Sequence, residues 1–220
     1  MKGIQSKYKG LLIDLDGTII DSRKDIASSV NATLTQLGLK ELPLDDIYKY
    51  IGNGAPVLMQ RALTKSLGED PSRMLEPGIS LFMTHYGKHL LVETKCYPGV
   101  HKLLGELSDF NKVVITNKPK ILSIDILKGL DILSHFTLVI GGDDVLKKKP
   151  DPEGVYKALE WMKLPPEEVI MVGDNYTDIE SGHSAGVATC FCSYGMGELK
   201  SIEPQYRIDS FRGLKDILYQ

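Results

Sequence analysis

The sequence predicts an α/β fold, with a Rossmann-like parallel sheet, helices on both faces of that sheet and an inserted α-helical cap. Through the second half of the chain, short β-branched runs alternate with helical segments, which favours a parallel sheet. Between residues 22 and 94 this alternation stops, and only helical periodicity remains. Right-handed crossovers between parallel strands place helices on both faces and leave the carboxyl ends of the strands free for ligands. We therefore expect a core domain of residues 1–21 and 95–220 and a cap domain of residues 22–94.

The strands are predicted from apolar runs that end in turn or polar residues. These runs occupy residues 10–13, 112–116, 137–140, 169–172 and 187–192. Helices are expected between the later strands, over residues 121–130, 154–162 and 177–185. Because each of these helices follows one strand and precedes the next, the second half has the pattern of β–α–β units.

The cap is predicted to consist of helices alone. Its first helix is indicated by apolar side chains that recur every three or four residues, at Ile26, Val30, Leu34 and Leu37. Gly38 follows at the place where a helix commonly ends in the left-handed conformation. Further helices fit residues 44–50, 56–67 and 73–91, and residues 97–99 form the linker back to the sheet.

Composition limits the classes of partner. The chain has 220 residues, 42% of them hydrophobic, which is enough for a buried core and one further unit. Lys and Arg total 26 against 29 Asp and Glu, so no strong field draws the protein to nucleic acid or to a membrane, and neither partner is expected. No apolar run approaches the roughly 20 residues of a membrane span, and residues 1–10 lack the apolar centre of a signal peptide, which predicts a cytoplasmic location. No heptad pattern is evident, so a monomer and a homodimer both remain open.

Two acidic residues, Asp14 and Asp16, follow the first predicted strand and are themselves followed by Gly17 and Thr18. Residues two apart on a strand face the same way, so both carboxylates are expected at one point of the sheet's carboxyl edge. Asp and Gly are common in ordinary turns, but an apolar strand before this pattern makes it more restrictive than an arbitrary turn. Two like charges about 5 Å apart repel by several kcal/mol at an effective dielectric near 20, so the pair requires a cation.

A second acidic pair, Asp174 and Asp178, follows the strand expected at residues 169–172 and opens a helix. In a parallel sheet this strand end lies on the same edge as Asp14. Carboxylate oxygens without a His or Cys ligand form the donor set that Mg²⁺ prefers. We therefore predict a magnesium ion at this edge.

Two further short segments contain residues that could bind a phosphoryl group. Thr116 and Asn117 end a predicted strand and offer a hydroxyl, an amide and backbone donors to phosphoryl oxygens. Lys149 ends a run of three lysines, and such runs are usually solvated surface. It directly precedes Pro150, which restrains its backbone, and its ammonium could offset the negative charge of a nucleophile and a phosphate.

Taken together, these residues resemble the motifs of the haloacid dehalogenase (HAD) superfamily of phosphatases. The resemblance spans nearly the whole chain and implies a HAD-like core with an inserted cap. In the family's order, the motifs are similar to Asp14 to Thr18, Thr116 with Asn117, Lys149, and Asp174 with Asp178. Tyr176 and Thr177, inside the last motif, stand where relatives often have smaller or charged residues.

The resemblance implies a role for each residue. Asp14 would attack phosphorus and form an aspartyl phosphate, and Asp16 would act first as general acid and then as general base. Thr116 and Lys149 would stabilise the charge of the transferring group. The ligands of Mg²⁺ would be a carboxylate oxygen of Asp14, the backbone carbonyl of Asp16, Asp174, and Asp178 either directly or through water. Dehalogenases of the superfamily usually lack an acid at the position of Asp16, so phosphate rather than halide chemistry is expected.

The cap contains a Gly-rich loop, residues 50–55, that resembles the specificity loop of bacterial phosphoglycolate phosphatases. Its Gly52, Asn53 and Gly54 are expected to bind the substrate together with Thr116, Asn117 and Lys149. Glycines around an Asn allow a small polar ligand to approach the backbone closely, although Gly-rich turns between helices are common. The expected partner is a small phosphorylated metabolite, with 2-phosphoglycolate first and another small phosphomonoester or pyrophosphate next. A phosphomutase is one alternative, which an assay of phosphate release would separate from a phosphatase. A catalytically idle binding protein is another, but such a protein has no need to retain the mutually repelling acids Asp14, Asp16 and Asp174 with Lys149.

Overall fold

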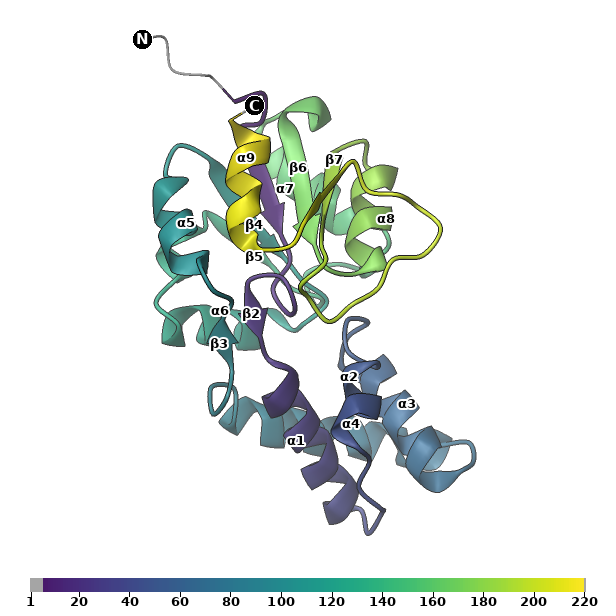
Figure 1. Ribbon diagram of the computed structural model, residues 1–220. Helices are drawn as coiled ribbons and strands as arrows, with labels where there is room; N and C mark the ends of the chain where they lie inside the picture. Colours follow the sequence, from purple (N-terminus) through teal and green to yellow (C-terminus); the bar gives the residue numbers. More distant parts are fainter. Residues whose placement is uncertain (1–5, 220) are drawn as a thin grey trace.

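The computed structural model describes residues 6–219, and its core is a six-stranded sheet in which all neighbouring strands are parallel (Figure 1). The strand order is β5-β4-β1-β6-β7-β8. These strands are β1 (Gly10–Ile13), β4 (Asn111–Ile115), β5 (Leu138–Ile140), β6 (Val169–Gly173), β7 (Ala188–Cys192) and β8 (Tyr206–Ile208). All but β8 were predicted to within one residue at each end, and the predicted α/β fold is confirmed.

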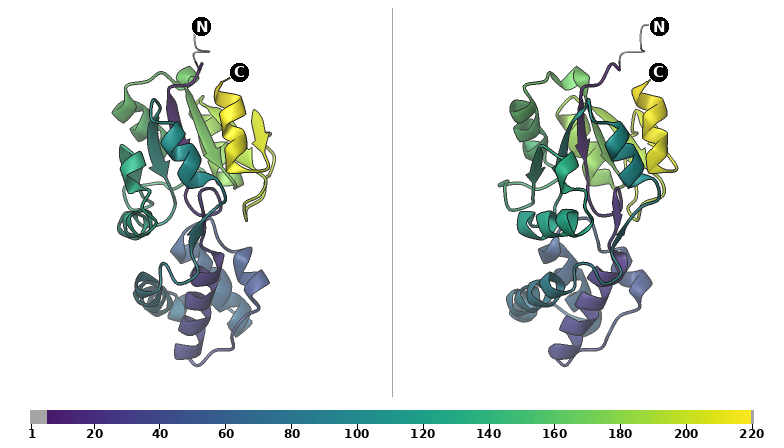
Figure 2. Two further views of the ribbon diagram at one scale, coloured as in Figure 1. Left: turned by 60° about the vertical axis from the view of Figure 1, so that its left-hand side comes forward. Right: turned by 90° about the vertical axis from the view of Figure 1, so that its left-hand side faces the viewer.

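Helices cover both faces of the sheet, as expected (Figure 2). They are α5 (Val100–Glu106), α6 (Lys120–Gly129), α7 (Glu153–Met162), α8 (Tyr176–Ser184) and α9 (Leu214–Leu218). Neighbouring residues of β1 point to opposite faces, so Leu11 and Leu12 belong to different apolar clusters. On the face of Leu11 lie Leu104 of α5 and Ile126 of α6, whereas Val155 of α7 packs on the face of Leu12. The sheet is thus buried on both sides, and its carboxyl edge is left for other contacts.

Four helices form a separate unit beyond the carboxyl ends of the strands (Figure 1). They are α1 (Arg23–Gln36), α2 (Leu44–Tyr48), α3 (Ala55–Leu67) and α4 (Ser72–Lys88). Gly38 follows α1 with φ +73, the left-handed conformation expected there. The helices α2 and α4 end before the predicted residues 50 and 91, because the chain turns after each of them, toward the Gly-rich loop and toward the linker. The unit joins the sheet through the short antiparallel pair β2 (Ile20–Asp21) and β3 (Lys95–Cys96).

One apolar cluster continues from the sheet into this helical unit. It contains Leu104 of α5 and Val114 of β4 in the core and Val30, Met59 and Phe82 in the helical unit. Since burial of apolar side chains is the dominant favourable contribution to folding, the same core stabilises both parts. Within residues 6–219 there is no helix with the length and apolar character that a membrane crossing requires.

Candidate active site

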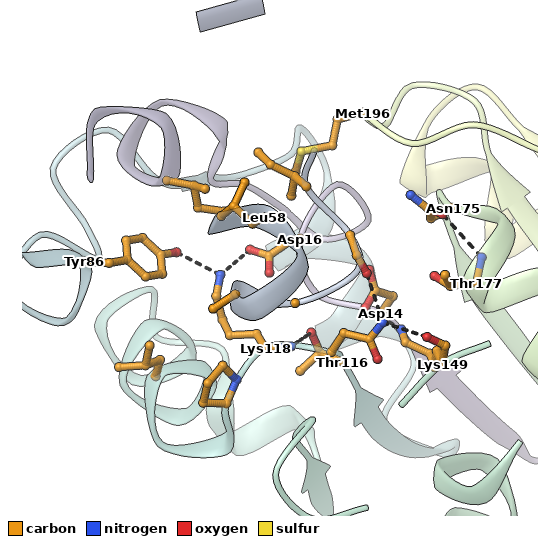
Figure 3. Close-up of a pocket in the computed structure, with 18 of the residues that line it drawn as sticks. Asp14, Asp16, Leu58, Tyr86, Thr116, Lys118, Lys149, Asn175, Thr177 and Met196 are labelled. Carbon is orange, nitrogen blue, oxygen red and sulfur yellow. Dashed lines mark hydrogen bonds and ion pairs between the residues drawn. The ribbon is translucent and has the colours of Figure 1, made fainter. Parts of the chain in front are cut away.

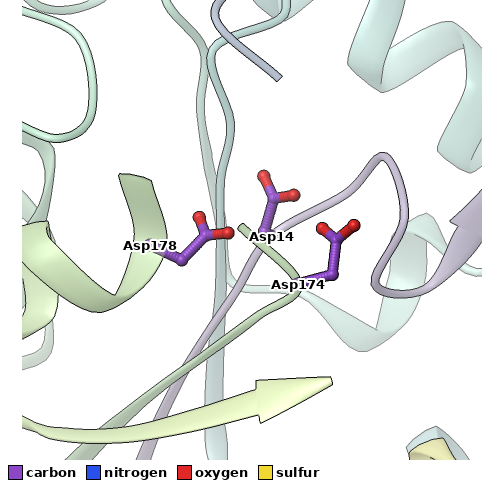
Figure 4. Close-up of side chains that lie close together, drawn as sticks. All are labelled: Asp14, Asp174 and Asp178. Atoms are coloured by element: carbon purple, nitrogen blue, oxygen red, sulfur yellow. The ribbon is translucent and has the colours of Figure 1, made fainter. Parts of the chain in front are cut away.

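Three of the four acidic residues expected at the carboxyl edge of the sheet converge there, and the carboxylate of the fourth, Asp16, points elsewhere. Asp14 follows β1, Asp174 follows β6, and Asp178 lies in the first turn of α8. One carboxylate oxygen of each lies within 4.8 Å of the others, and all three residues are buried (Figure 4). Because β1 and β6 are neighbours in the sheet, parallel pairing brings the ends of both strands to the same place.

Local backbone geometry fixes two of these carboxylates. Gly17 has φ +92, and a Cβ on it would lie 2.1 Å from Asp174 Oδ2, so only glycine allows this loop to pack on Asp174. At the start of α8, Asp178 Oδ2 accepts a hydrogen bond from the Asn175 backbone N–H at 3.0 Å. In return the Asn175 side chain accepts from the Thr177 N–H at 3.3 Å, which completes a capping box.

Lys149 lies inside the acidic cluster. Its Nζ donates to Asp14 Oδ1 at 2.7 Å (Figure 3). The same atom donates to Asp178 Oδ1 at 2.5 Å and to the Ile115 carbonyl at 2.7 Å. Although runs of lysines are usually solvated, Lys149 is only 6% exposed, whereas Lys147 is exposed and Lys148 is partly exposed. All three ammonium hydrogens are used, so the side chain is held in one orientation.

The charges of the cluster do not balance without a cation. Burial raises the pKa of Asp174 to about 7, and the charge of Asp178 acts in the same direction, while hydrogen bonds from the Met196 and Gly197 backbone oppose the shift. Burial also raises the pKa of Asp14, against the opposing effect of Lys149. Both shifts show that the charged forms of these carboxylates are unfavourable when they are buried together. When all three are ionised, one ammonium leaves a net negative charge, and a set of oxygen ligands suits a hard divalent ion. This cluster could hold a metal ion.

The predicted residues after β4 take different positions. Thr116 is buried and lines a cavity at the edge of the sheet. The Asn117 side-chain amide donates to the Lys149 carbonyl at 2.9 Å and to the Gly52 carbonyl at 3.0 Å. Both of its donors are therefore taken by main chain, so in this structure Asn117 joins the lysine segment to the loop of the helical unit.

The Gly-rich loop of the helical unit lies against the last motif. Gly52 and Gly54 line the cavity, whereas Asn53 is not among the lining residues. The Asn53 amide instead donates to the Tyr176 hydroxyl at 3.0 Å. Tyr176, which departs from the family pattern in the sequence, thus serves as a contact between the two parts of the chain.

Asp16 points its carboxylate toward the helical unit and not toward the acidic cluster (Figure 3). Its Oδ1 accepts from the Ser22 hydroxyl at 2.5 Å and from Lys118 Nζ at 2.5 Å. Lys118 Nζ also donates to the hydroxyl of Tyr86 on α4 at 2.8 Å. Lys118 is buried, and although burial lowers its pKa, Asp16 and Tyr86 outweigh that effect and raise the pKa above its usual value.

The cavity between the sheet edge and the helical unit has a volume of about 60 Å³. One buried water needs roughly 10–15 Å³ by the same kind of measure, so this space suits a small ligand rather than a large one. Its polar lining residues include Asp14, Asp16, Thr116, Lys149 and Asp174. Its apolar lining residues are Ile26, Ile51, Leu58, Phe82 and Met83 of the inserted segment and Leu122 of α6.

The model of the haloacid dehalogenase-like hydrolase family matches residues 11–192, most of the chain. The chain belongs to this family. Among its relatives, a phosphoglycolate phosphatase of Nitrosospira multiformis is 36% identical over 204 residues, which cover 91% of this chain and 88% of the relative. Another, from Aquifex aeolicus, is 38% identical over 200 residues, with 90% and 91% covered. The crystal structure of a predicted phosphoglycolate phosphatase from Haemophilus somnus has a TM-score of 0.91 at 30% identity, with 96% of this chain and 98% of that chain covered.

Two residues of this haloacid dehalogenase-like hydrolase were missed in the sequence, Lys118 and Tyr86. Lys118 directly follows Thr116 and Asn117, so its place at a strand end was the one available signal. A single lysine usually lies on the surface, and only the packing of α4 over the sheet edge buries this one. Tyr86 lies in a predicted helix of the cap, where an aromatic residue indicates only a packed face.

Proposed function

We propose that the chain is a Mg²⁺-dependent phosphatase that hydrolyses 2-phosphoglycolate to glycolate and phosphate through an aspartyl phosphate on Asp14. The observation that carries the proposal is the buried Asp14 carboxylate, which lies between Lys149 and two further acids at the bottom of a small cavity. The identity to phosphoglycolate phosphatases over nearly the whole chain supports this choice of substrate.

In the first step, an Asp14 carboxylate oxygen forms a bond to phosphorus as the bond to the ester oxygen breaks. Asp16 gives a proton to the departing oxygen and later takes one from the water that attacks the aspartyl phosphate. Asp16 suits this role because it lines the same cavity as Asp14 and its carboxylate lies toward the helical unit, where the leaving group would be placed (Figure 3). Lys149 and Thr116 stabilise charge on the phosphoryl oxygens.

The Mg²⁺ ion would be held by Asp14, Asp174 and the backbone carbonyl of Asp16. It would supply positive charge that offsets the carboxylates and the substrate phosphate. Asp178 already accepts hydrogen bonds on both oxygens, from Lys149 and from the Asn175 backbone, which favours a role through water or through Lys149.

The test is a screen of phosphate release over small phosphomonoesters, with and without Mg²⁺. It includes 2-phosphoglycolate, pyrophosphate, sugar phosphates and nucleotides. We expect metal-dependent release with the highest kcat/KM on 2-phosphoglycolate, because the cavity is small. A preference for a large nucleotide would contradict the small-substrate proposal. An isomeric sugar phosphate formed without free phosphate would identify a phosphomutase instead.

A further inference from the structure

Lys118 is a buried ammonium for which the mechanism above has no use. Its residue is 7% exposed, and it lines the cavity. Its Nζ donates to Asp16 Oδ1 at 2.5 Å and to the Tyr86 hydroxyl at 2.8 Å (Figure 3). An ammonium carries three hydrogens, and among residues 6–219 these two partners accept two of them. One N–H therefore remains for a ligand in the cavity.

The surroundings of Lys118 make it the group that an anionic leaving group would meet. The cavity that it lines also has apolar residues in its wall, including Leu58, Phe82 and Leu122. Of these, Phe82 stacks on Tyr86, the hydrogen-bond partner of Lys118, with 5.4 Å between the ring centroids. The other ammonium among the described lining residues, Lys149, is already held by two carboxylates and a carbonyl. An apolar wall excludes water, so a charge interaction made here is less screened than one at the surface.

The spacing between Asp16 and Lys118 matches the spacing of charge in the proposed substrate. In 2-phosphoglycolate, a single methylene carbon separates the ester oxygen from the carboxylate. A general acid at the ester oxygen and a cation at the carboxylate must therefore be neighbours. Asp16 and Lys118 are in direct contact, and Tyr86 of α4 orients the ammonium from the side of the helical unit.

We propose that Lys118 is the specificity-determining residue that binds the carboxylate of the leaving group. The enzyme then selects phosphomonoesters of short 2-hydroxy acids over esters of uncharged alcohols of the same size. This inference rests on the proposed function, and it gives Tyr86 a positioning role.

The test compares 2-phosphoglycolate with 2-phosphoglycolamide, in which a neutral amide replaces the carboxylate. One hydrogen bond between charged groups corresponds to a preference of about 10- to 100-fold in kcat/KM for the carboxylate in the wild-type enzyme. Lys118→Met removes the ammonium and keeps the apolar stem. We expect this preference to fall to about 1, with KM for 2-phosphoglycolate rising most. Lys128→Met, an exposed lysine of α6, is the matched control and should keep the preference.

Equal losses on both substrates in Lys118→Met would overturn the proposal, since Lys118 would then act only by positioning Asp16. A wild-type enzyme that hydrolyses both substrates equally would also overturn it and would leave the phosphatase activity intact. Release of phosphate from no ester in the screen would instead contradict the proposed function.

A binding measurement tests recognition of the carboxylate by Lys118 independently of phosphatase activity. By calorimetry, the wild-type protein should bind glycolate at least about tenfold more tightly than glycolamide, and Lys118→Met should lose that difference. Should Lys118→Met fail to fold, Tyr86→Phe removes one partner of the ammonium and is expected to reduce the difference several-fold. An unchanged difference in Tyr86→Phe would then overturn the proposal.

Discussion

At the scale of single residues, turnover should depend most on Asp14. Asp14→Asn keeps the size of the side chain but replaces the attacking oxygen by an amide, which forms no aspartyl phosphate. We expect phosphate release from 2-phosphoglycolate to fall by at least about a thousandfold. Asp109→Asn, at an exposed acid before β4, is the matched control, and circular dichroism checks the fold of both variants. Turnover of Asp14→Asn within tenfold of the wild-type enzyme would contradict the assignment of the nucleophile.

Lys149 should matter for stability as well as for rate. Lys149→Met leaves Asp14 and Asp178 buried without their ammonium partner. Removing one member of a buried ion pair typically costs about 3–5 kcal/mol, so we expect a loss of that size in the unfolding free energy of the metal-free protein. Lys147→Met, at an exposed lysine two residues earlier, should change it by less than about 0.5 kcal/mol. Urea unfolding in the presence of a chelator measures both, and equal stabilities would refute the structural role of Lys149.

The raised pKa of Asp174 predicts how the affinity for Mg²⁺ depends on pH. Burial raises its pKa to about 7 in the metal-free protein, from the ordinary aspartate value of 3.8. At pH values between the two pKa values, the folded metal-free state therefore binds more protons than the unfolded state. The contribution of Asp174 to the free energy of unfolding is lost as the pH rises toward 7. Because the proton competes with Mg²⁺, affinity for Mg²⁺ should weaken by up to about tenfold per pH unit below 7 and level off above it. Titration calorimetry from pH 5.5 to 8 checks this, and an affinity independent of pH would refute it.

At the scale of elements, the sequence predicted a strand or helix wherever the residues of that element alone show an apolar pattern. The strands β1 and β6 were predictable because each is a continuous apolar run that is buried on both faces. The residues of β8, Tyr206–Ile208, were not, because a short edge strand with a central Arg has no such pattern. The residues of the site differ in the same respect. Asp14 and Asp174 directly follow buried strands, whereas the burial of Lys118 depends on α4, which is distant in the sequence.

The contact between the loop after α2 and the start of α8 is a second element-scale feature. The Asn53 amide donates to the Tyr176 hydroxyl at 3.0 Å, which holds the helical unit against the sheet edge. One such hydrogen bond is worth about 1 kcal/mol, so Asn53→Ala and Tyr176→Phe should each lower kcat/KM about fivefold, mainly through KM. The double variant should lose no more than either single one. Additive losses would argue against a shared contact, and Tyr156→Phe, at an exposed tyrosine of α7, serves as control.

At the scale of the whole molecule, the helical unit and the sheet are joined by a shared apolar core and by the pair β2 and β3. A buried carboxylate reinforces this connection. Asp25, in the first turn of α1, is 4% exposed and accepts from the Glu93 N–H at 3.0 Å, the Thr94 N–H at 2.8 Å and the Thr94 hydroxyl at 2.7 Å. These bonds tie the chain that enters the helical unit to the chain that leaves it, so they set how the unit is attached to the sheet.

Asp25→Ala tests this connection, because it leaves the buried Thr94 N–H and hydroxyl without their acceptor. These buried donors lose hydrogen bonds to a charged carboxylate, so we expect the free energy of unfolding to fall by about 3 kcal/mol. Hydrogen exchange should show more: amides of α1 to α4 should lose protection first, while those of β1 and β6 follow only the global change. Asp45→Ala, at an exposed acid in the first turn of α2, is the matched control and should change neither measurement appreciably. If protection instead fell equally throughout the molecule, Asp25 would contribute to overall stability without governing the attachment of the helical unit.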